Sequence, residues 1–272
     1  MSWFTDPQLV AGLLLLGAVA GFLAGLLGVG GGMMMVPFMT WILGHRGVEP
    51  GLAVKMAIAT SMATILFTSI SSVRAHHRRG AVQWPIVRHM APGIVLGGLA
   101  AGAGAFALVK GQALALSFAL FVGFAATRML FVRQAPASWP MPGAWGQAAV
   151  GSGIGFVSGL VGAGGAFMSV PFMGRCGVPM HQAVATSAAL GLPIALANTA
   201  GYVVGGWNVH SGVPGSLGYL VLPALLIIAA ASVTLAPLGA RVAHAIDTRK
   251  LKQVFALLLY GLAGYMSWRA FS

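Results

Sequence analysis

The chain has 272 residues, of which 58% are apolar and only 7% are charged. An ordinary soluble protein carries about 25% charged residues, so this composition excludes a water-soluble globular fold. The net charge of +12 would suggest nucleic-acid binding on a soluble chain. Here Lys and Arg lie mainly in short stretches between apolar runs, where they orient membrane helices and contact anionic lipid.

Apolar segments follow one another along the chain and predict an all-α integral membrane protein. A regular helix needs about 20 apolar residues to cross a bilayer. Segments 32–44 and 165–174 are too short for this, and each follows a glycine cluster; the other segments are about long enough to cross. The first run is expected to stay in the mature protein, because no basic region precedes it. We place the segments at 8–28, 32–44, 51–74, 84–109, 112–133, 143–163, 165–174, 180–204, 216–240 and 250–270.

The beginning of the chain is repeated in its second half. Residues 21–39 and 155–173 lie 134 positions apart and are identical at 12 of 19 positions, Pro and Phe among them. Further on, Ala59-Thr60-Ser61 matches Ala185-Thr186-Ser187. Many transporters are built from internal repeats of this kind.

The placement of Lys and Arg predicts how the repeats cross the membrane. The basic loops are expected in the cytoplasm, and loop 205–215, which has no Lys or Arg, outside. Segment 51–74 then runs inward and its counterpart 180–204 runs outward, so the repeats have inverted topology. The simplest arrangement has three full spans per repeat, preceded by a pair that enters and returns; alternatively the short segments also cross, giving five. The N-terminal transmembrane repeat, 1–137, and the C-terminal one, 138–272, together form one transport domain.

The glycine clusters at 28–32 and 162–165 predict a broken helix in each repeat. Glycine costs about 1 kcal/mol relative to Ala inside a helix and accepts positive φ. We expect a short helix to begin after each cluster, near Met33 and Ala166. The first N–H groups of such a helix lack helical partners and attract anions. Two such ends would meet near the midplane. The alternative is that the glycines only serve close helix packing.

Other polar residues could line the same site. The hydroxyls of the two Thr-Ser pairs can donate to an anion or bond back to their own helix. Lys55 either draws anions into the pathway or extends its amine to the membrane surface, with Glu49 as a possible partner. Asn198 can bond a substrate or a neighbouring helix. The candidate substrate-binding residues are Gly30, Gly31, Gly32, Met33, Lys55, Thr60, Ser61, Gly164, Gly165, Ala166, Thr186, Ser187 and Asn198.

The acidic residues Asp6, Glu49 and Asp247 all fall near segment ends, so coupling through a buried carboxylate is not expected. A potential that is negative inside drives anions outward, which favours export. The sequence contains no Gly-x-Ser-x-Gly or His-x-x-x-His pattern, and therefore no enzyme, cofactor or metal site is predicted. We interpret the three methionines after the first break as gap filling.

The paired motifs resemble the sulfite exporter TauE/SafE family. They are Gly-Leu-Leu-Gly-Val-Gly-Gly-Gly at 25–32 and Gly-Leu-Val-Gly-Ala-Gly-Gly at 159–165, each followed by Val-Pro-Phe and then by Ala-Thr-Ser. The resemblance covers nearly the whole chain. It implies a multi-pass permease of a bacterial or archaeal cytoplasmic membrane that moves sulfite, organosulfonates or related anions, with its pathway at these motifs.

The second copy departs from the first at Ala166, which stands where the first has Gly32, so its turn is expected to be tighter or less mobile. The expected partners are a small anionic substrate and the lipid bilayer, without nucleic acid, and a homo-oligomer is possible. A transporter of another small solute or of a metal ion with the same fold is the alternative function.

Overall fold

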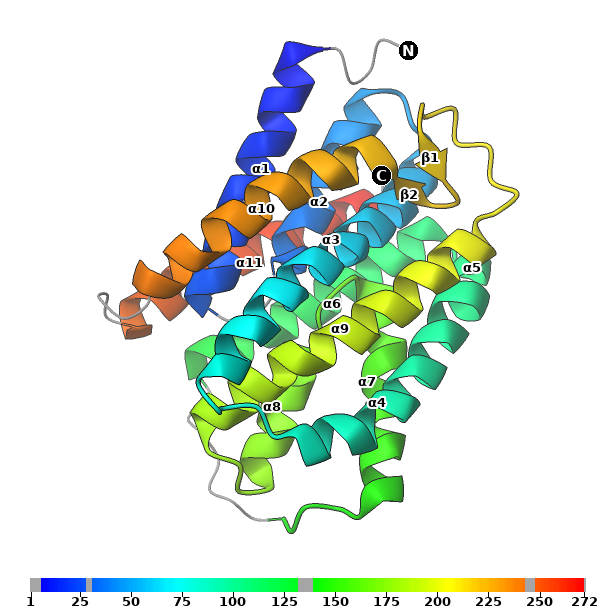
Figure 1. Ribbon diagram of the computed structural model, residues 1–272. Coiled ribbons are helices and arrows are strands. Elements are labelled where there is room, and N and C mark those ends of the chain that lie inside the picture. Colours follow the sequence, from blue (N-terminus) through cyan, green and yellow to red (C-terminus); the bar gives the residue numbers. More distant parts are fainter. Residues whose placement is uncertain (1–5, 28–30, 132–138, 243–247, 272) are drawn as a thin grey trace.

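The computed structural model describes residues 6–27, 31–131, 139–242 and 248–271, which form helices, their connecting loops and one short hairpin (Figure 1). Within this part of the chain, seven helical stretches are long and apolar enough to span a membrane, which confirms the predicted all-α membrane class. In chain order the elements are α1 Pro7–Leu27, α2 Gly32–His45, α3 Pro50–Arg78, α4 Trp84–Leu99, the π-helical segment η1 Ala100–Ala105, α5 Phe106–Leu108, α6 Gly111–Phe131, α7 Ala144–Val161, α8 Ala166–Arg175, α9 Met180–Gly205, β1 Ser216–Leu217, β2 Leu220–Val221, α10 Leu222–Val242 and α11 Thr248–Phe271.

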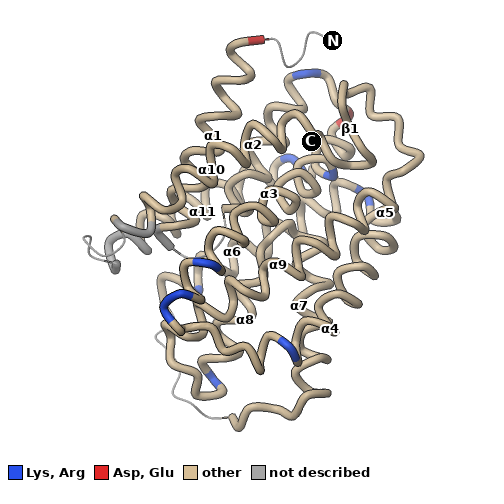
Figure 2. The backbone as a smooth tube through the Cα atoms, viewed as in Figure 1, with Lys and Arg blue, Asp and Glu red and all other residues tan. Residues whose placement is uncertain are grey.

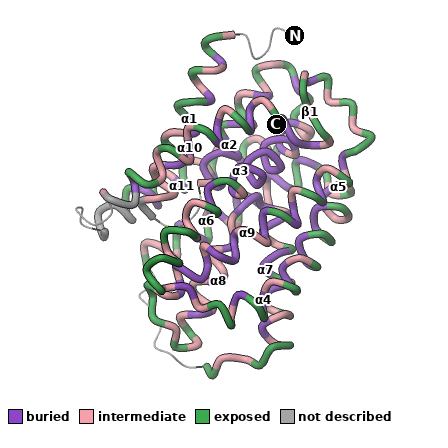
Figure 3. Tube along the Cα trace, in the orientation of Figure 1, coloured by how far each residue is buried: buried purple, intermediate pink, exposed green. Residues whose placement is uncertain are grey.

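The predicted segments correspond to these helices with two differences. Segment 216–240 begins with the β1–β2 hairpin, and its helix starts only at Leu222. Segment 143–163 forms α7, which is not among the seven spans of the described chain, because Gln147 and several Gly and Ser residues lower its hydropathy. The helices α3 and α9 are the most buried of the seven, and Figure 3 shows the buried residues concentrated along them.

The molecule has two ends, which we name by what lies there. The hairpin end holds β1–β2, the start of α3 and the end of α9; the arginine end holds the last turn of α3 and the starts of α4 and α9 (Figure 1). At the hairpin end Gly111 lies against Gly51. At the arginine end the Gln83 side chain donates to the Gln182 side chain over 2.9 Å. Since α3 starts at the end where α9 finishes, these two helices run in opposite directions. Figure 2 shows basic residues at both ends and, in the described chain, acidic residues only at the hairpin end.

Each short helix returns to the end from which its pair started. Asp6, just before α1, forms an ion pair with Arg46, just after α2, so the α1–α2 pair begins and finishes at the hairpin end. The Trp139 amide, ahead of α7, donates to the carbonyl oxygen of Arg175 at the end of α8 over 3.1 Å. With 14 residues, α2 is about 21 Å long, less than the roughly 30 Å of bilayer hydrocarbon.

Glycines allow the long helices of the two halves to pack closely. Helix α1 lies along α10, and α7 lies along α4. A Cβ atom placed on Gly21 of α1 would overlap the carbonyl oxygen of Ser232 in α10. A Cβ atom on Gly155 of α7 would overlap the carbonyl oxygen of Ile94 in α4. Small residues are required where membrane helices approach this closely.

Candidate functional site

The second glycine cluster breaks the helix as expected. Gly162 ends α7 with φ +67°, and Gly165 precedes α8 with φ +71°; both conformations are left-handed. A residue with a side chain pays about 1–2 kcal/mol in this region, which explains why glycine occupies both positions. Gly164 lies between them and is half-buried. The new helix begins at Ala166, as the sequence predicts.

At the first break, the structure describes Gly31 and the helix that follows it. Helix α1 ends at Leu27 and α2 begins at Gly32; the predicted site residue Gly30 lies outside the described residues. Gly31 has φ −62°, so it needs no left-handed conformation. A Cβ atom on Gly31 would instead lie 2.5 Å from the carbonyl oxygen of Ala20 in α1. Close approach to the preceding helix therefore requires glycine here.

The two breaks lie next to each other in the centre of the molecule. A Cβ atom on Gly32 would be 2.8 Å from the carbonyl oxygen of Gly162. Gly162 in turn faces Val36 of α2 and Ile58 of α3. The start of α2 and the end of α7, which lie 130 residues apart in the sequence, thus meet beside the buried helices α3 and α9.

The start of α8 presents free backbone donors. The amides of Met168 and Ser169 bond to the carbonyl oxygen of Gly165. The amides of Ala166 and Phe167 make no hydrogen bond within the described residues, as expected for the first turn of a helix. Because a helix N-terminus also carries about half a positive charge, this turn can accept a small anion. At the other break, Met33 is buried and 2% exposed.

Four serine hydroxyls lie on the helices that form or adjoin the breaks. The Ser169 hydroxyl in α8 donates to the Ser187 hydroxyl in α9 over 2.8 Å. Ser61, the counterpart of Ser187 in α3, is 1% exposed. Its hydroxyl, like that of Ser158 near Gly165, has no hydrogen-bond partner within the part of the chain that the structure describes. Buried polar groups without a partner are uncommon in proteins, so these hydroxyls are available to a bound ligand.

The two candidate threonines have partners that the sequence did not reveal. The Thr60 hydroxyl accepts a hydrogen bond of 3.1 Å from the amide of Val221, directly before α10. The Thr186 hydroxyl accepts one of 3.0 Å from the amide of Gln83, directly before α4. Each threonine thus fixes the start of a helix that belongs to the other half of the chain. Because these partners lie 161 and 103 residues away, no local pattern indicates them.

Two further candidates are held by the protein itself. The Lys55 ammonium donates to the carbonyl oxygen of Ala107 over 2.9 Å and lies 5.5 Å from the ring centre of Tyr219. Glu49 was a possible partner of Lys55, but its carboxylate accepts from two amides of the first turn of α3. The Asn198 side chain donates to the carbonyl oxygens of Ile194 and Gly155, as an amide between helices does. The Asn198 side-chain oxygen has no partner among the described residues.

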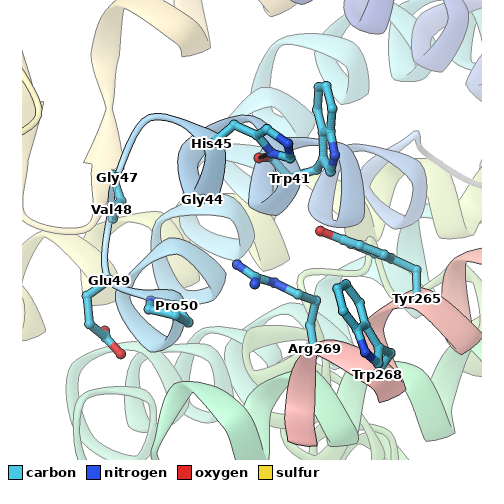
Figure 4. Close-up of a pocket in the computed structure, with 10 residues that line it drawn as sticks. All are labelled: Trp41, Gly44, His45, Gly47, Val48, Glu49, Pro50, Tyr265, Trp268 and Arg269. Atoms are coloured by element: carbon cyan, nitrogen blue, oxygen red, sulfur yellow. Dashed lines mark hydrogen bonds between the residues drawn. The ribbon is translucent and has the colours of Figure 1, made fainter. Parts of the chain in front are cut away.

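A cavity that sequence reasoning missed lies away from the breaks, at the hairpin end. It measures about 500 Å³ and separates the end of α2 from the last turns of α11 (Figure 4). Its walls include Trp41, Tyr265, Trp268 and Arg269. Separately, no cluster of three side chains suited to a metal ion occurs among the described residues.

The sequence is similar to those of known membrane transporter proteins. A sequence profile described as sulfite exporter TauE/SafE matches residues 13–266. A probable membrane transporter protein of Haemophilus influenzae is 36% identical over 251 residues, which cover 92% of this chain and 95% of that one. A probable membrane transporter protein of Methanocaldococcus jannaschii is 25% identical over 260 residues and 91% of each chain. A third, from Bacillus subtilis, is 39% identical over 80 residues, 29% of this chain and 27% of its own. No solved structure matches the chain significantly.

Proposed function

The chain belongs to the TauE/SafE family of membrane transporters, and from this premise we propose that it is a permease for small sulfur-containing anions such as sulfite or organosulfonates. We propose further that the anion is held near the midplane, between the helix starts that follow the two glycine breaks. The observation that carries this proposal is the contact of Gly32 with Gly162, beside a first turn of α8 whose amides of Ala166 and Phe167 are free within the described chain.

We propose that the site is built from two inverted repeats, 1–137 and 138–272. In support, the α1–α2 pair opens toward the hairpin end and α7–α8 toward the arginine end. The glycine contacts also correspond: Gly17 faces Ile228 as Gly151 faces Met90. The hydrogen bonds of Thr60 and Thr186 to the starts of α10 and α4 form a third matching pair.

Hydroxyl and amide groups, rather than full charges, would hold the substrate. The sequence has no Asp, Glu, Lys or Arg at 8–45 or 134–174, the stretches that contain the two breaks, or at 56–73, the part of α3 that contains Thr60 and Ser61. Within the proposed site, Ser61, Ser187 and the amides of α8 donate to the anion, while Gly30, Gly31, Gly164 and Gly165 shape the turns. We keep Lys55 and Asn198 as proposed pathway residues. Only those polar groups of their side chains that have no partner among the described residues would contact the substrate.

A site of this kind supports transport driven by the gradient and the membrane potential. One monovalent anion crossing 100 mV gains about 2.3 kcal/mol, and a potential that is negative inside moves it outward. No carboxylate lies in the middle of a predicted apolar segment, so export without proton or sodium coupling is the expected mode.

The test is anion efflux from proteoliposomes loaded with sulfite or a small alkanesulfonate. Efflux should depend on the protein, rise when the interior is made negative, and be unaffected by dissipating a proton or sodium gradient. Ser187→Ala should slow it, whereas Ser117→Ala should not, because Ser117 lies on α6 and bonds only the Ala113 carbonyl. The proposal fails if no anion of such a panel gives protein-dependent flux.

A further inference from the structure

The cavity at the hairpin end contains Arg269, which forms no ion pair with a carboxylate among the residues that the structure describes. Arg269, in the last turn of α11, extends over the end of α2 (Figure 4). A Cβ atom on Gly44 would lie 2.7 Å from one of its terminal nitrogens, so the absence of a side chain there makes room for the guanidinium. The Nε atom of Arg269 is buried and has no hydrogen-bond partner among the described residues.

The carboxylate that lines the cavity does not pair with this arginine. Glu49 directs its two oxygens to the amides of Gly51 and Leu52, at 2.9 and 2.6 Å, and thereby caps α3. The nearby Asp6 is paired with Arg46. The C-terminal ends of α2 and α11 favour a cation at this position through their dipoles. Within the described residues, however, no carboxylate pairs with the N–H groups of the guanidinium. Arginine presents these groups as a fork that fits phosphate and sulfonate oxygens.

The walls of the cavity indicate that the ligand is amphipathic. Trp41 and Trp268 are 50% and 62% exposed, and Tyr265 extends between Trp268 and the end of α2. Tryptophan and tyrosine at the ends of membrane helices lie at the level of the lipid headgroups. A free inorganic anion uses none of this aromatic surface, whereas a lipid places its phosphate at Arg269 and its glycerol and upper acyl carbons against the rings.

We propose that this cavity binds the phosphate group of a phospholipid from the leaflet at the hairpin end, with Arg269 as the oxyanion ligand and Trp41, Trp268 and Tyr265 as the wall. The bound lipid joins the α2 half-helix, which belongs to the first break, to α11. The site is separate from the proposed substrate site, so its occupancy can be measured whether or not the protein moves sulfite.

The experiment is titration of the detergent-purified protein with short-chain phosphatidylglycerol, read by native mass spectrometry. Arg269→Gln should weaken the tightest lipid-binding step about tenfold, a loss of about 1.4 kcal/mol. Arg269→Lys should lose less, because it keeps the charge without the fork. Lys110→Gln is the matched control, since it removes an exposed cation at the same end that does not line the cavity. An unchanged melting temperature of each variant shows that the fold is retained.

A second arm separates the lipid from a free oxyanion. Inorganic sulfate at millimolar concentration should not displace the lipid from the wild-type protein, and Trp268→Ala should weaken lipid binding without creating sulfate binding. Equal lipid affinity for the wild type and Arg269→Gln overturns the proposal. Displacement of the lipid by sulfate also overturns it, because the site would then bind a soluble anion.

Discussion

The two helix breaks share a sequence motif but have different surroundings. At the first break, Met33, Met34 and Met35 are all buried, each at most 3% exposed. At the second, the equivalent positions are Phe167, Met168 and Ser169, and the first two are only partly buried. The first break is therefore closed by apolar side chains, while the second leaves its helix start more accessible.

One substitution between the copies accounts for much of this difference. Ser169 of the second copy bonds Ser187, whereas the first copy has Met35 at that position. The counterpart of Ser187, Ser61, is left without a partner in the described chain. A shared motif thus preserves the backbone break without preserving its chemistry. Under the proposed function, the second break would hold the anion with groups that are already positioned, whereas the first would orient the Ser61 hydroxyl only when the anion binds.

The largest loss of stability is expected at two glycines that occupy equivalent positions in the two halves. Gly21→Val and Gly155→Val each place a side chain against a backbone carbonyl of the helix packed alongside. Each should lower the free energy of unfolding by about 3 kcal/mol, the upper end for overpacking. Thermal unfolding in detergent measures this effect.

Each of these helices contains its own control. Gly12 in α1 and Gly153 in α7 have open space where a Cβ atom would be added, so the same change to Val at these positions should cost much less. If Gly155→Val were severe and Gly21→Val harmless, the two halves would not pack equivalently, and the proposed repeat symmetry would lose its support.

Removing the threonine hydroxyls should destabilise the protein to a different extent in the two halves. Thr60→Val leaves the buried amide of Val221 without an acceptor, which costs about 1–3 kcal/mol. Thr186→Val does the same to Gln83, but this residue is only partly buried and water can replace the hydroxyl. Thr60→Val should therefore be the more destabilising change in thermal unfolding. Replacement of either threonine by Ser keeps the acceptor and should restore most of the loss.

Sequence alone predicts those features that a local pattern determines. Apolar length gives the membrane helices, and the glycine cluster at 162–165 gives the break in which Gly162 and Gly165 adopt positive φ. Charge placement predicts the opposite directions in which α3 and α9 are observed to run.

The partners of the polar side chains could not be predicted, because they lie far away along the chain. Lys55 bonds a carbonyl group 52 residues later, and Thr60 bonds an amide 161 residues later. The β1–β2 hairpin was hidden inside an apolar run that composition alone assigns to a helix. The cavity at Arg269 arises only when α11 returns beside α2, so no stretch of sequence indicates it.

The serines allow the breaks to be compared by stability and by transport. Ser169→Ala removes a buried hydrogen bond and should cost about 0.5–1.5 kcal/mol. Ser61→Ala removes a hydroxyl that has no partner in the described chain, so stability should stay constant or rise slightly. Under the proposed function it should still raise the substrate concentration needed for half-maximal flux. A loss of stability in Ser61→Ala equal to that in Ser169→Ala would show that the two breaks are more alike than their side chains suggest.

The smallest expected effect on stability concerns the contacts that join the two ends of each helix pair, α1–α2 and α7–α8. The Arg46 guanidinium holds the pKa of the Asp6 carboxyl below its usual value, so this ion pair contributes stability above the ordinary pKa of Asp, about 3.9. That contribution is lost as the pH falls through the lowered value. The second pair is fastened instead by Arg175, which lies 5.3 Å from the ring centre of Trp139, and this contact contains no carboxylate.

Acid should therefore loosen the start of α1 and leave the start of α7 unchanged, which hydrogen exchange resolved to these two helices can measure. The change should be small, because both partners of the first ion pair are about one-third exposed and exposed ion pairs contribute little. Asp6→Asn should remove the acid response, and high salt should imitate it, since salt screens an exposed pair. An acid response of equal size at α7 would mean that a carboxylate elsewhere controls both helix pairs, and the comparison between their fastenings would fail.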